Sequence, residues 1–136
     1  MNQISAGGVV IKNNKVLILR QYSGVYCLPK GRIEWDETVE NAAIREVKEE
    51  TNIDAEIVQY IGKIAYAYFN YHKKLKVNKE VYWFLMRPTT FNIKPQTSEG
   101  FKYAYFLRLN DAARRLTFKA ERQMLKDAMR LYRSDR

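Results

Sequence analysis

Short apolar runs separated by turn-forming residues predict strands in the first part of the chain. Residues 4–11 are small and apolar, and Asn13 and Asn14 form a turn signal before the apolar run at 16–19. A short apolar run bounded by turn residues is typical of a buried strand. The pattern therefore predicts a hairpin, followed by a loop over residues 20–26.

A period of 3.6 residues predicts a helix over residues 38–51. Its small and apolar positions share one flank with Glu50, namely Val39, Ala42, Ala43 and Val47. Thr38 is the expected N-cap, because its hydroxyl can accept a hydrogen bond from a free amide of the first turn. We expect Asn52 to end the helix, because Asn tolerates the left-handed conformation found beyond helix ends.

Alternating apolar residues predict further strands after this helix. Residues 53–68 are expected to form one or two strands, and the basic segment 72–76 a polar connection. The β-branched and aromatic run 80–87 predicts a strong strand, which Pro88 ends. We expect a loop over residues 89–100.

The end of the chain predicts one more strand and then helices. The strand is expected over residues 103–107, and Asn110 or Asp111 can cap a helical turn. Thr117 is the expected cap of a longer helix from Phe118 onward. Strands around an early helix, with a late helix after them, indicate an α/β fold in which a mixed sheet packs between helices.

Composition and charge narrow the class of protein. The chain has 136 residues, which predicts a single domain over 1–136. Its 24 basic and 15 acidic residues give a net charge of +9, which favours anionic partners such as nucleotides, nucleic acid or an acidic membrane surface. The one cysteine, Cys27, excludes an internal disulfide. Without a signal-like start or a long apolar segment, we expect a soluble cytoplasmic protein with no membrane partner.

Three carboxylates carry the most informative chemistry. Glu46, Glu49 and Glu50 have spacings that place them on one side of the predicted helix, where like charges repel. A divalent cation such as Mg²⁺, which prefers oxygen ligands, would relieve the repulsion. A solvated, glutamate-rich face is the alternative. Arg45 can pair with Glu49 or with Glu37.

Together these residues resemble the sequence motif of the Nudix family. Gly31 is followed after five residues by Glu37, and after seven more by residues 45–53, Arg-Glu-Val-Lys-Glu-Glu-Thr-Asn-Ile. Asn52 stands where the family has Gly, a mild change because both residues tolerate a left-handed backbone. The family's usual Pro-Gly before the first Glu is replaced by Trp35 and Asp36. The resemblance implies the Nudix fold, an α/β/α sandwich with a mixed sheet between helices.

The resemblance also implies a role for each matching residue. It implies Mg²⁺, or alternatively Mn²⁺, held by Glu46, Glu49 and Glu50, with Glu46 or Glu50 as the general base. Arg45 and Glu37 match the pair that orients the ligands, and the carbonyl of Gly31 matches a further ligand. Family members often add a carboxylate from outside the motif, for which Glu99 is the candidate and Glu80 a weaker one.

The implied reaction is hydrolysis of a nucleoside diphosphate linked to another group, by attack of water on phosphorus. Residues 28–31 and 80–86 look like those of diadenosine polyphosphate hydrolases, so cleavage of diadenosine tetraphosphate to ATP and AMP is the leading hypothesis. One alternative is a Nudix pyrophosphatase for nucleoside triphosphates, other nucleotide derivatives or RNA 5′-ends. The other is a nucleotide-binding Nudix module without catalysis.

Basic and aromatic residues are the candidates for binding a small nucleotide. Lys30 and Lys79 can bind phosphate charge, and Tyr82 resembles the base-stacking position of the subgroup, with Tyr22 as a second candidate. Tyr26, Tyr66 and Tyr71 are weaker candidates, and the lysines at 73, 74 and 76 fit either phosphate binding or a solvated loop. We expect His72 to be solvated and Cys27 to be a buried, inert thiol. The oligomeric state stays open.

Overall fold

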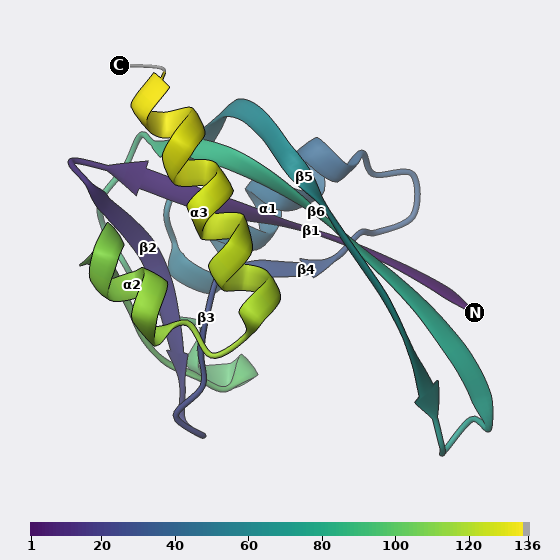
Figure 1. Cartoon of the computed structure of the whole chain (residues 1–136). Coiled ribbons are helices and arrows are strands. Elements are labelled where there is room, and N and C mark those ends of the chain that lie inside the picture. The colour runs from purple at the N-terminus through teal and green to yellow at the C-terminus, as the bar shows by residue number, and fades with distance from the viewer. Residues whose placement is uncertain (135–136) are drawn as a thin grey trace.

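A twisted mixed sheet of seven strands forms the centre of the protein in the computed structural model, which describes residues 1–134 (Figure 1). The strands are β1 (Asn2–Lys12), β2 (Lys15–Gln21), β3 (Tyr26–Cys27), β4 (Lys30–Arg32), β5 (Ala55–Asn70), β6 (Leu75–Pro88) and β7 (Phe101–Arg108). They follow the order β3-β2-β1-β6-β5, with β4 also paired to β1 and β7 to β2. Because β1 runs parallel to β6 and antiparallel to β2, the sheet is mixed, as the sequence predicts.

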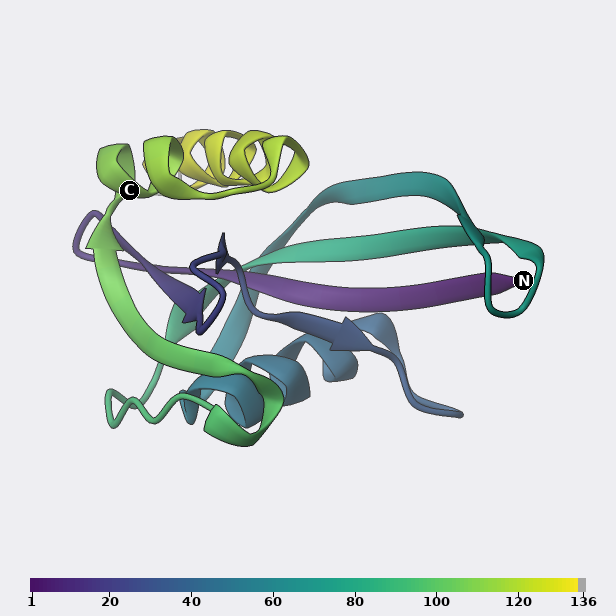
Figure 2. The same cartoon turned by 90° about the horizontal axis from the view of Figure 1, so that it is seen from below.

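Helices cover both faces of the sheet (Figure 2). Helix α1 (Val39–Thr51) lies on one face and helix α3 (Lys119–Ser134) on the other. Helix α2 (Leu109–Arg115) packs against α3 and β2, and a short 3₁₀ helix, η1 (Thr97–Glu99), precedes β7. The expected α/β/α sandwich is confirmed. In the described part of the chain, no helix is long and apolar enough to cross a bilayer.

Alternation along the central strands divides the core into two clusters. Successive side chains of a strand point to opposite faces. In β1, Val9 therefore packs in the cluster under α3, whereas Val10 packs in the cluster under α1. In β6, Trp83 and Leu85 belong to the α3 side, and Phe84 belongs with the α1 side.

The turn and cap signals of the first half are confirmed. Asn13 and Asn14 have φ values of 53° and 60° and connect β1 to β2. The Thr38 hydroxyl accepts a hydrogen bond from the Asn41 amide at 3.1 Å. Asn52 caps α1 in the left-handed conformation, with φ of 66°.

Several boundaries predicted from the sequence are wrong. Residues 55–70 form one long strand, which is one of the two alternatives predicted for this segment. β6 begins at Leu75 instead of residue 80, so the connection shrinks to a turn over 71–74. The Thr117 hydroxyl accepts from the Tyr26 amide at 2.9 Å, and α3 begins two residues later. No side chain caps α2, which begins at Leu109. The short strands β3 and β4 were not expected.

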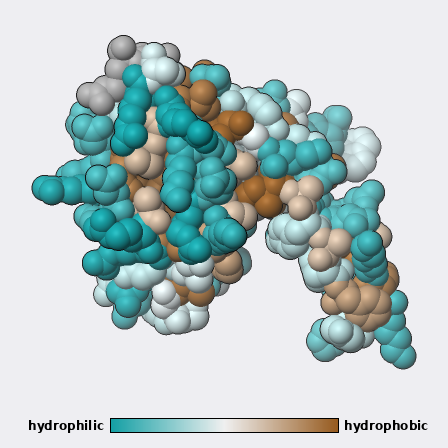
Figure 3. All heavy atoms as spheres, in the orientation of Figure 1, coloured by the Kyte–Doolittle hydropathy of each residue, from teal (hydrophilic) through white to brown (hydrophobic). Residues whose placement is uncertain are grey.

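The far ends of β5 and β6 project from the body of the protein (Figures 1 and 3). We call residues 65–79, which include the turn between these strands, the arm. The first residues of β1 pair with the β6 side of the arm, from Asn2 opposite Asn78 to Gln3 opposite Lys79. The arm is therefore an extension of the central sheet and has three strands at its base.

The left-handed backbone at residue 52 predicts a measurable difference between two variants. Both Asn52→Ala and Asn52→Gly lose the hydrogen bond that the Asn52 side chain donates to the Asn92 carbonyl at 2.8 Å. Only the alanine variant is also destabilised by the left-handed backbone, by about 1 kcal/mol, because glycine has no Cβ. Urea unfolding should therefore show Asn52→Ala to be less stable than Asn52→Gly by about 1 kcal/mol. Equal stabilities would contradict this account of the helix end.

Candidate active site

Helix α1, strand β4 and the loop before β7 meet at a cavity rich in carboxylates. The cavity has a volume of about 290 Å³. It is lined by Lys30, Gly31, Glu46, Glu49, Glu50, Gln96, Glu99 and Phe101. The structure thus brings all five predicted metal ligands around one space, including Glu99, which lies far from the others in the sequence.

Arg45 binds the carboxylates that surround it. Its Nε and one terminal nitrogen donate to the two carboxylate oxygens of Glu37 at 2.7 and 2.8 Å, a bidentate pair. Its other terminal nitrogen donates to Glu46 at 2.7 Å and to Glu49 at 3.2 Å. These hydrogen bonds from Arg45 hold the pKa of Glu37 below its usual value. The sequence left two partners open for Arg45, and the structure shows that it binds both.

The absence of a side chain at Gly31 lets Glu46 approach the backbone of β4. A Cβ atom at residue 31 would collide with the carboxylate of Glu46. Residue 31 pairs with Ala6 of β1, which fixes the position of β4 beside the central strand. Gly31 and the Glu46 carboxylate therefore lie against each other in the wall of the cavity.

Glu50 is the most buried of the three helix carboxylates. It is 7% exposed, and one of its oxygens accepts a hydrogen bond from the Lys30 amide at 2.9 Å. Burial, followed by the negative charge of Glu46, raises the pKa of Glu50 to about 8. Burial also raises the pKa of Glu46. In both groups the loss of water around the carboxylate is the largest cause, because burial disfavours the charged form.

Backbone hydrogen bonds hold the loop that carries Glu99 against the end of α1. The Lys94 amide donates to the Thr51 carbonyl at 2.9 Å, and the Gln96 amide donates to the Glu50 carbonyl at 3.0 Å. Gly100 follows with φ of 90°, a conformation that glycine adopts without strain. The loop therefore brings the carboxylate of Glu99 to the same cavity as the helix carboxylates.

The chemistry of this donor set fits a hard divalent cation. Four carboxylates and a backbone carbonyl offer only oxygen, which Mg²⁺ and Mn²⁺ favour. Among residues 1–134, no three carboxylate, imidazole or thiol side chains converge closely enough to coordinate an ion as they stand. Arg45 is ion-paired with both Glu46 and Glu49. A bound cation would compete with Arg45 for these oxygens.

A second cavity, of about 490 Å³, adjoins the first through Lys30. It lies between β5, β6 and the beginning of α3, and is lined by Gln21, Lys30, Ile64, Tyr66, Lys79, Val81, Trp83, Phe118, Ala120 and Glu121. Apolar and aromatic side chains thus form most of its wall, with lysine ammonium groups at Lys30 and Lys79. Such a wall suits a ring system that is attached to an anionic group.

Glu121 ties the loop before β4 to α3, and the sequence analysis missed it. Its carboxylate, 4% exposed, accepts from the Leu28 amide at 2.8 Å and from the Lys30 ammonium at 2.7 Å. Burial alone would lower the pKa of Lys30, but the charge and hydrogen bond of Glu121 raise it. A signal was present, because Glu121 shares the buried face of α3 with Met124, Leu125 and Ala128.

Other predicted binding residues lie outside both cavities. Tyr82 lies on the α1 face of β6, packs near Tyr60 and donates to Glu80 at 3.0 Å. It points away from the second cavity because its neighbours Val81 and Trp83 take the opposite face. Tyr22 is exposed under the ammonium of Lys102. The structure therefore does not bring Tyr82 or Tyr22 to the carboxylates.

The remaining candidates are placed as follows. Lys30 lines both cavities, and Lys79 and Tyr66 line the second. Glu80, the weaker metal candidate, pairs with Lys63 at 3.4 Å instead. Tyr26 packs against the core on the α3 side of the sheet, and Trp35 is 94% exposed. The arm carries the rest, namely Tyr71, His72 and the lysines at 73, 74 and 76. Cys27 is buried, as expected.

Comparison with known proteins points to one family. The family model described as the NUDIX domain matches residues 1–128. Nudix hydrolase 10 of Arabidopsis thaliana is 32% identical over 118 residues, which cover 82% of this chain and 39% of that protein. An ADP-ribose pyrophosphatase of Methanocaldococcus jannaschii is 35% identical over 63 residues, which cover 43% of this chain and 37% of that protein. The matched regions thus span less than half the length of these two relatives.

The fold is shared with solved structures as well. The crystal structure of an ADP-ribose pyrophosphatase from Streptococcus suis superimposes with a TM-score of 0.74 at 20% identity. The match covers 98% of this chain and 94% of that one. At this identity the likeness supports the architecture alone.

The buried pair of Lys30 and Glu121 predicts a large loss of stability. Glu121→Ala would leave the Lys30 ammonium and the Leu28 amide without a carboxylate, and removing one partner of a buried pair costs about 3 kcal/mol. Lys126→Ala, on the exposed face of the same helix, should change stability by less than about 0.5 kcal/mol. Urea unfolding of both variants measures the difference. A Glu121→Ala protein as stable as Lys126→Ala would refute this role.

Cys27 should be unreactive in the folded protein. Burial, followed by the charge of Glu121, raises the pKa of its thiol to about 12, so little thiolate exists at neutral pH. Labelling with Ellman's reagent should therefore be slow at pH 8 and become fast when urea unfolds the chain. Rapid labelling of the native protein would contradict the buried placement.

Proposed function

The chain belongs to the Nudix family, and on that premise we propose that it is a pyrophosphohydrolase that depends on a divalent metal. Its substrate would be a nucleoside diphosphate linked to another group. The observation that carries the proposal is the carboxylate cavity joined through Lys30 to a cavity with an aromatic wall. The first suits a metal-bound diphosphate, and the second suits the ring of a nucleoside.

The residues of the carboxylate cavity would have different roles in hydrolysis. Glu46, Glu49 and Glu50 would hold Mg²⁺ or Mn²⁺, with the Gly31 carbonyl and Glu99 as further ligands. When bound, the cation supplies charge neutralisation on the phosphate oxygens. Arg45 would orient the ligands, because its planar guanidinium fixes several carboxylates at once.

A carboxylate of the same cavity would activate the attacking water. Glu46 or Glu50 would take its proton as the water oxygen bonds to phosphorus and the bridging oxygen leaves with the other phosphate. The Lys30 ammonium, which lies beside Glu121 and the Trp83 ring in the wall of the second cavity, would bind an oxygen of the phosphate chain. Lys79 would bind phosphate charge from the other side of the second cavity.

Two candidate substrates differ in the group that is linked to the nucleoside diphosphate. Residues 28–31 and 80–86, which look like those of diadenosine polyphosphate hydrolases, favour diadenosine tetraphosphate, and this substrate stays a prediction. The name of the Methanocaldococcus relative supports ADP-ribose instead. Both compounds contain an adenosine diphosphate unit, so one site can be tested with both, together with nucleoside triphosphates.

Hydrolysis that depends on the carboxylates would test the proposal. The wild-type protein with Mg²⁺ would be given ADP-ribose, diadenosine tetraphosphate, NADH and a nucleoside triphosphate, and the products separated by ion exchange. Glu49→Gln and Glu50→Gln should each lower kcat by about a hundredfold or more, because each removes a ligand or the base. Glu40→Gln, an exposed residue on the same helix, should retain full activity.

Metal-dependent stabilisation separates a binding module from an enzyme. If Mg²⁺ raises the thermal midpoint of the wild-type protein but no phosphoanhydride is cleaved, the protein is a nucleotide-binding module. If Mg²⁺ has no effect on stability or turnover, the carboxylate cavity is not a metal site and the proposal fails.

A further inference from the structure

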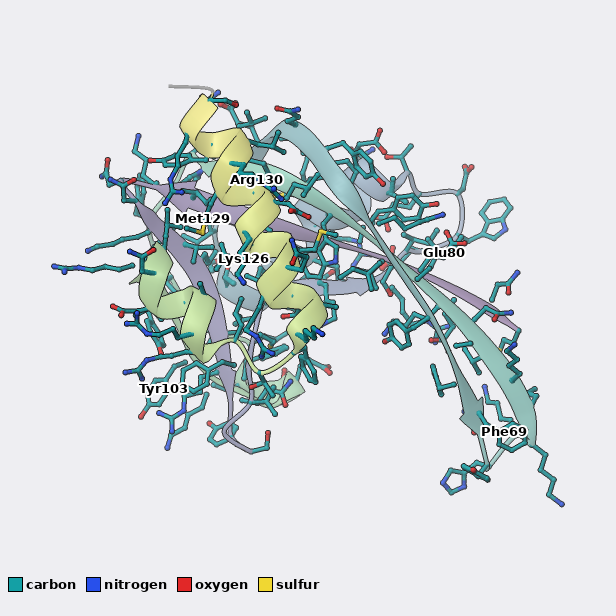
Figure 4. The ribbon with its side chains drawn as sticks, viewed as in Figure 1. Phe69, Glu80, Tyr103, Lys126, Met129 and Arg130 are labelled. Carbon is teal, nitrogen blue, oxygen red and sulfur yellow. The ribbon has the colours of Figure 1, made fainter. Side chains whose placement is uncertain are left out.

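The arm exposes aromatic side chains that the hydrophobic core does not use. Tyr66, Tyr68, Phe69 and Tyr71 are all exposed, and Tyr71 at the turn reaches 81%. Figure 4 shows Phe69 at the free end of the arm, away from the body. Exposing large apolar groups together is unfavourable for a surface that remains in water, so this clustering marks an interaction surface.

The charge of the arm has a single sign. Residues 65–79 contain four lysines, at positions 73, 74, 76 and 79, and no aspartate or glutamate. At the base of the arm, Glu80 is paired with Lys63 at 3.4 Å. Across residues 1–134, none of the four arm lysines takes part in an ion pair. The arm therefore offers positive charge to a partner.

Two aromatic side chains of β5 lie opposite lysines of β6 in the arm. Tyr66 is opposite Lys79, and Phe69 is opposite Lys76. Residues opposite each other in an antiparallel pair share a face of the sheet. Each face of the arm thus places a ring beside an ammonium group.

The face that carries Tyr66 leads directly into the second cavity. Tyr66 and Lys79 line that cavity, and Tyr68 follows on the same face, with ring centroids 6.3 Å apart. The Tyr68 hydroxyl donates to Gln3 of β1 at 3.5 Å. An extended ligand with one end in the cavities would therefore lie along the rings of Tyr66 and Tyr68.

We propose that the arm binds single-stranded nucleic acid whose phosphorylated end reaches the carboxylate cavity. Exposed rings stack on bases of any sequence, and lysines beside them neutralise the phosphates between the bases. A second copy of this chain fits less well, because two arms would bring eight lysines together without an acidic partner in either. The proposal rests on the proposed function only for the end of the nucleic acid, since binding to the arm requires no hydrolysis.

Fluorescence anisotropy with the full-length protein tests the proposal. The probe is a 5′-phosphorylated oligoribonucleotide of about twelve residues, labelled at its 3′ end and used with EDTA so that it stays intact. The same sequence as DNA, and as a duplex, shows which nucleic acid the arm prefers. The charge variant is Lys73→Ala/Lys74→Ala/Lys76→Ala. Its matched control, Lys12→Ala/Lys94→Ala/Lys126→Ala, loses equal charge from exposed positions outside the arm.

The expected results distinguish binding by the arm from binding that depends only on the net positive charge of the protein. The charge variant should bind the single strand about tenfold more weakly than the control and lower the slope of log Kd against log salt by about two, since each lysine accounts for about 0.7. Tyr68→Ala/Tyr71→Ala should weaken binding by about tenfold and leave that slope unchanged. The charge variant should still hydrolyse ADP-ribose, which has no chain to reach the arm.

Several outcomes would overturn the proposal. Equal weakening by the two lysine triples would show that only net charge matters, and a duplex bound as tightly as the single strand would exclude stacking. A dimer in sedimentation that dissociates in Tyr68→Ala/Tyr71→Ala would assign the arm to self-association. If the wild-type protein cleaves no phosphoanhydride yet binds the single strand through the arm, the proposed function fails and this inference stands.

Discussion

The repulsion between carboxylates on one helix is the constraint that organises this structure. Glu46, Glu49 and Glu50 lie within two turns of α1, beside a second source of negative charge at Glu99. Arg45 offsets part of this charge through Glu46 and Glu49 and is itself fixed by its bidentate pair with Glu37. Burial, followed by the negative charge of Glu46, raises the pKa of Glu50 to about 8. A divalent cation bound as proposed would offset the remaining negative charge.

The rest of the fold serves to hold this cluster at the edge of the sheet. β1 pairs with β4 and so brings Gly31 against Glu46, while the loop before β7 is bound to the end of α1. From the opposite face, Glu121 of α3 holds the Lys30 ammonium and the Leu28 amide. One short segment, residues 28–31, therefore connects the two faces of the sandwich and the two cavities.

Local chemistry explains which features the sequence could predict. Thr38, Asn52 and the turn at Asn13 and Asn14 depend on neighbouring residues, so their roles follow from the sequence. The same holds for the face shared by Glu46, Glu49 and Glu50, since helical spacing alone sets it. Glu99 lines the same cavity, and only the resemblance to a family suggested it as a candidate.

Features that depend on distant pairing were not predictable in this way. β6 begins at Leu75 because its first residues pair with the end of β5, Leu75 opposite Asn70, and its parallel pairing with β1 follows from Asn78. The sequence of the turn gives no sign of this early start. Tyr82 was expected at the substrate, but its position depends on which face of β6 turns toward α3. The Thr117 hydroxyl bonds to Tyr26 instead of capping a helix, because the fold brings the two segments together.

The location of a bound metal tests the central claim most directly. Crystals grown with Mn²⁺ and ADP would reveal the ion by its anomalous scattering. The account predicts Mn²⁺ between Glu46, Glu49 and Glu50, in contact with phosphate oxygens, and Arg45 displaced from at least one of these carboxylates. ADP bound with Mn²⁺ elsewhere, and Arg45 still bonded to both Glu46 and Glu49, would contradict it.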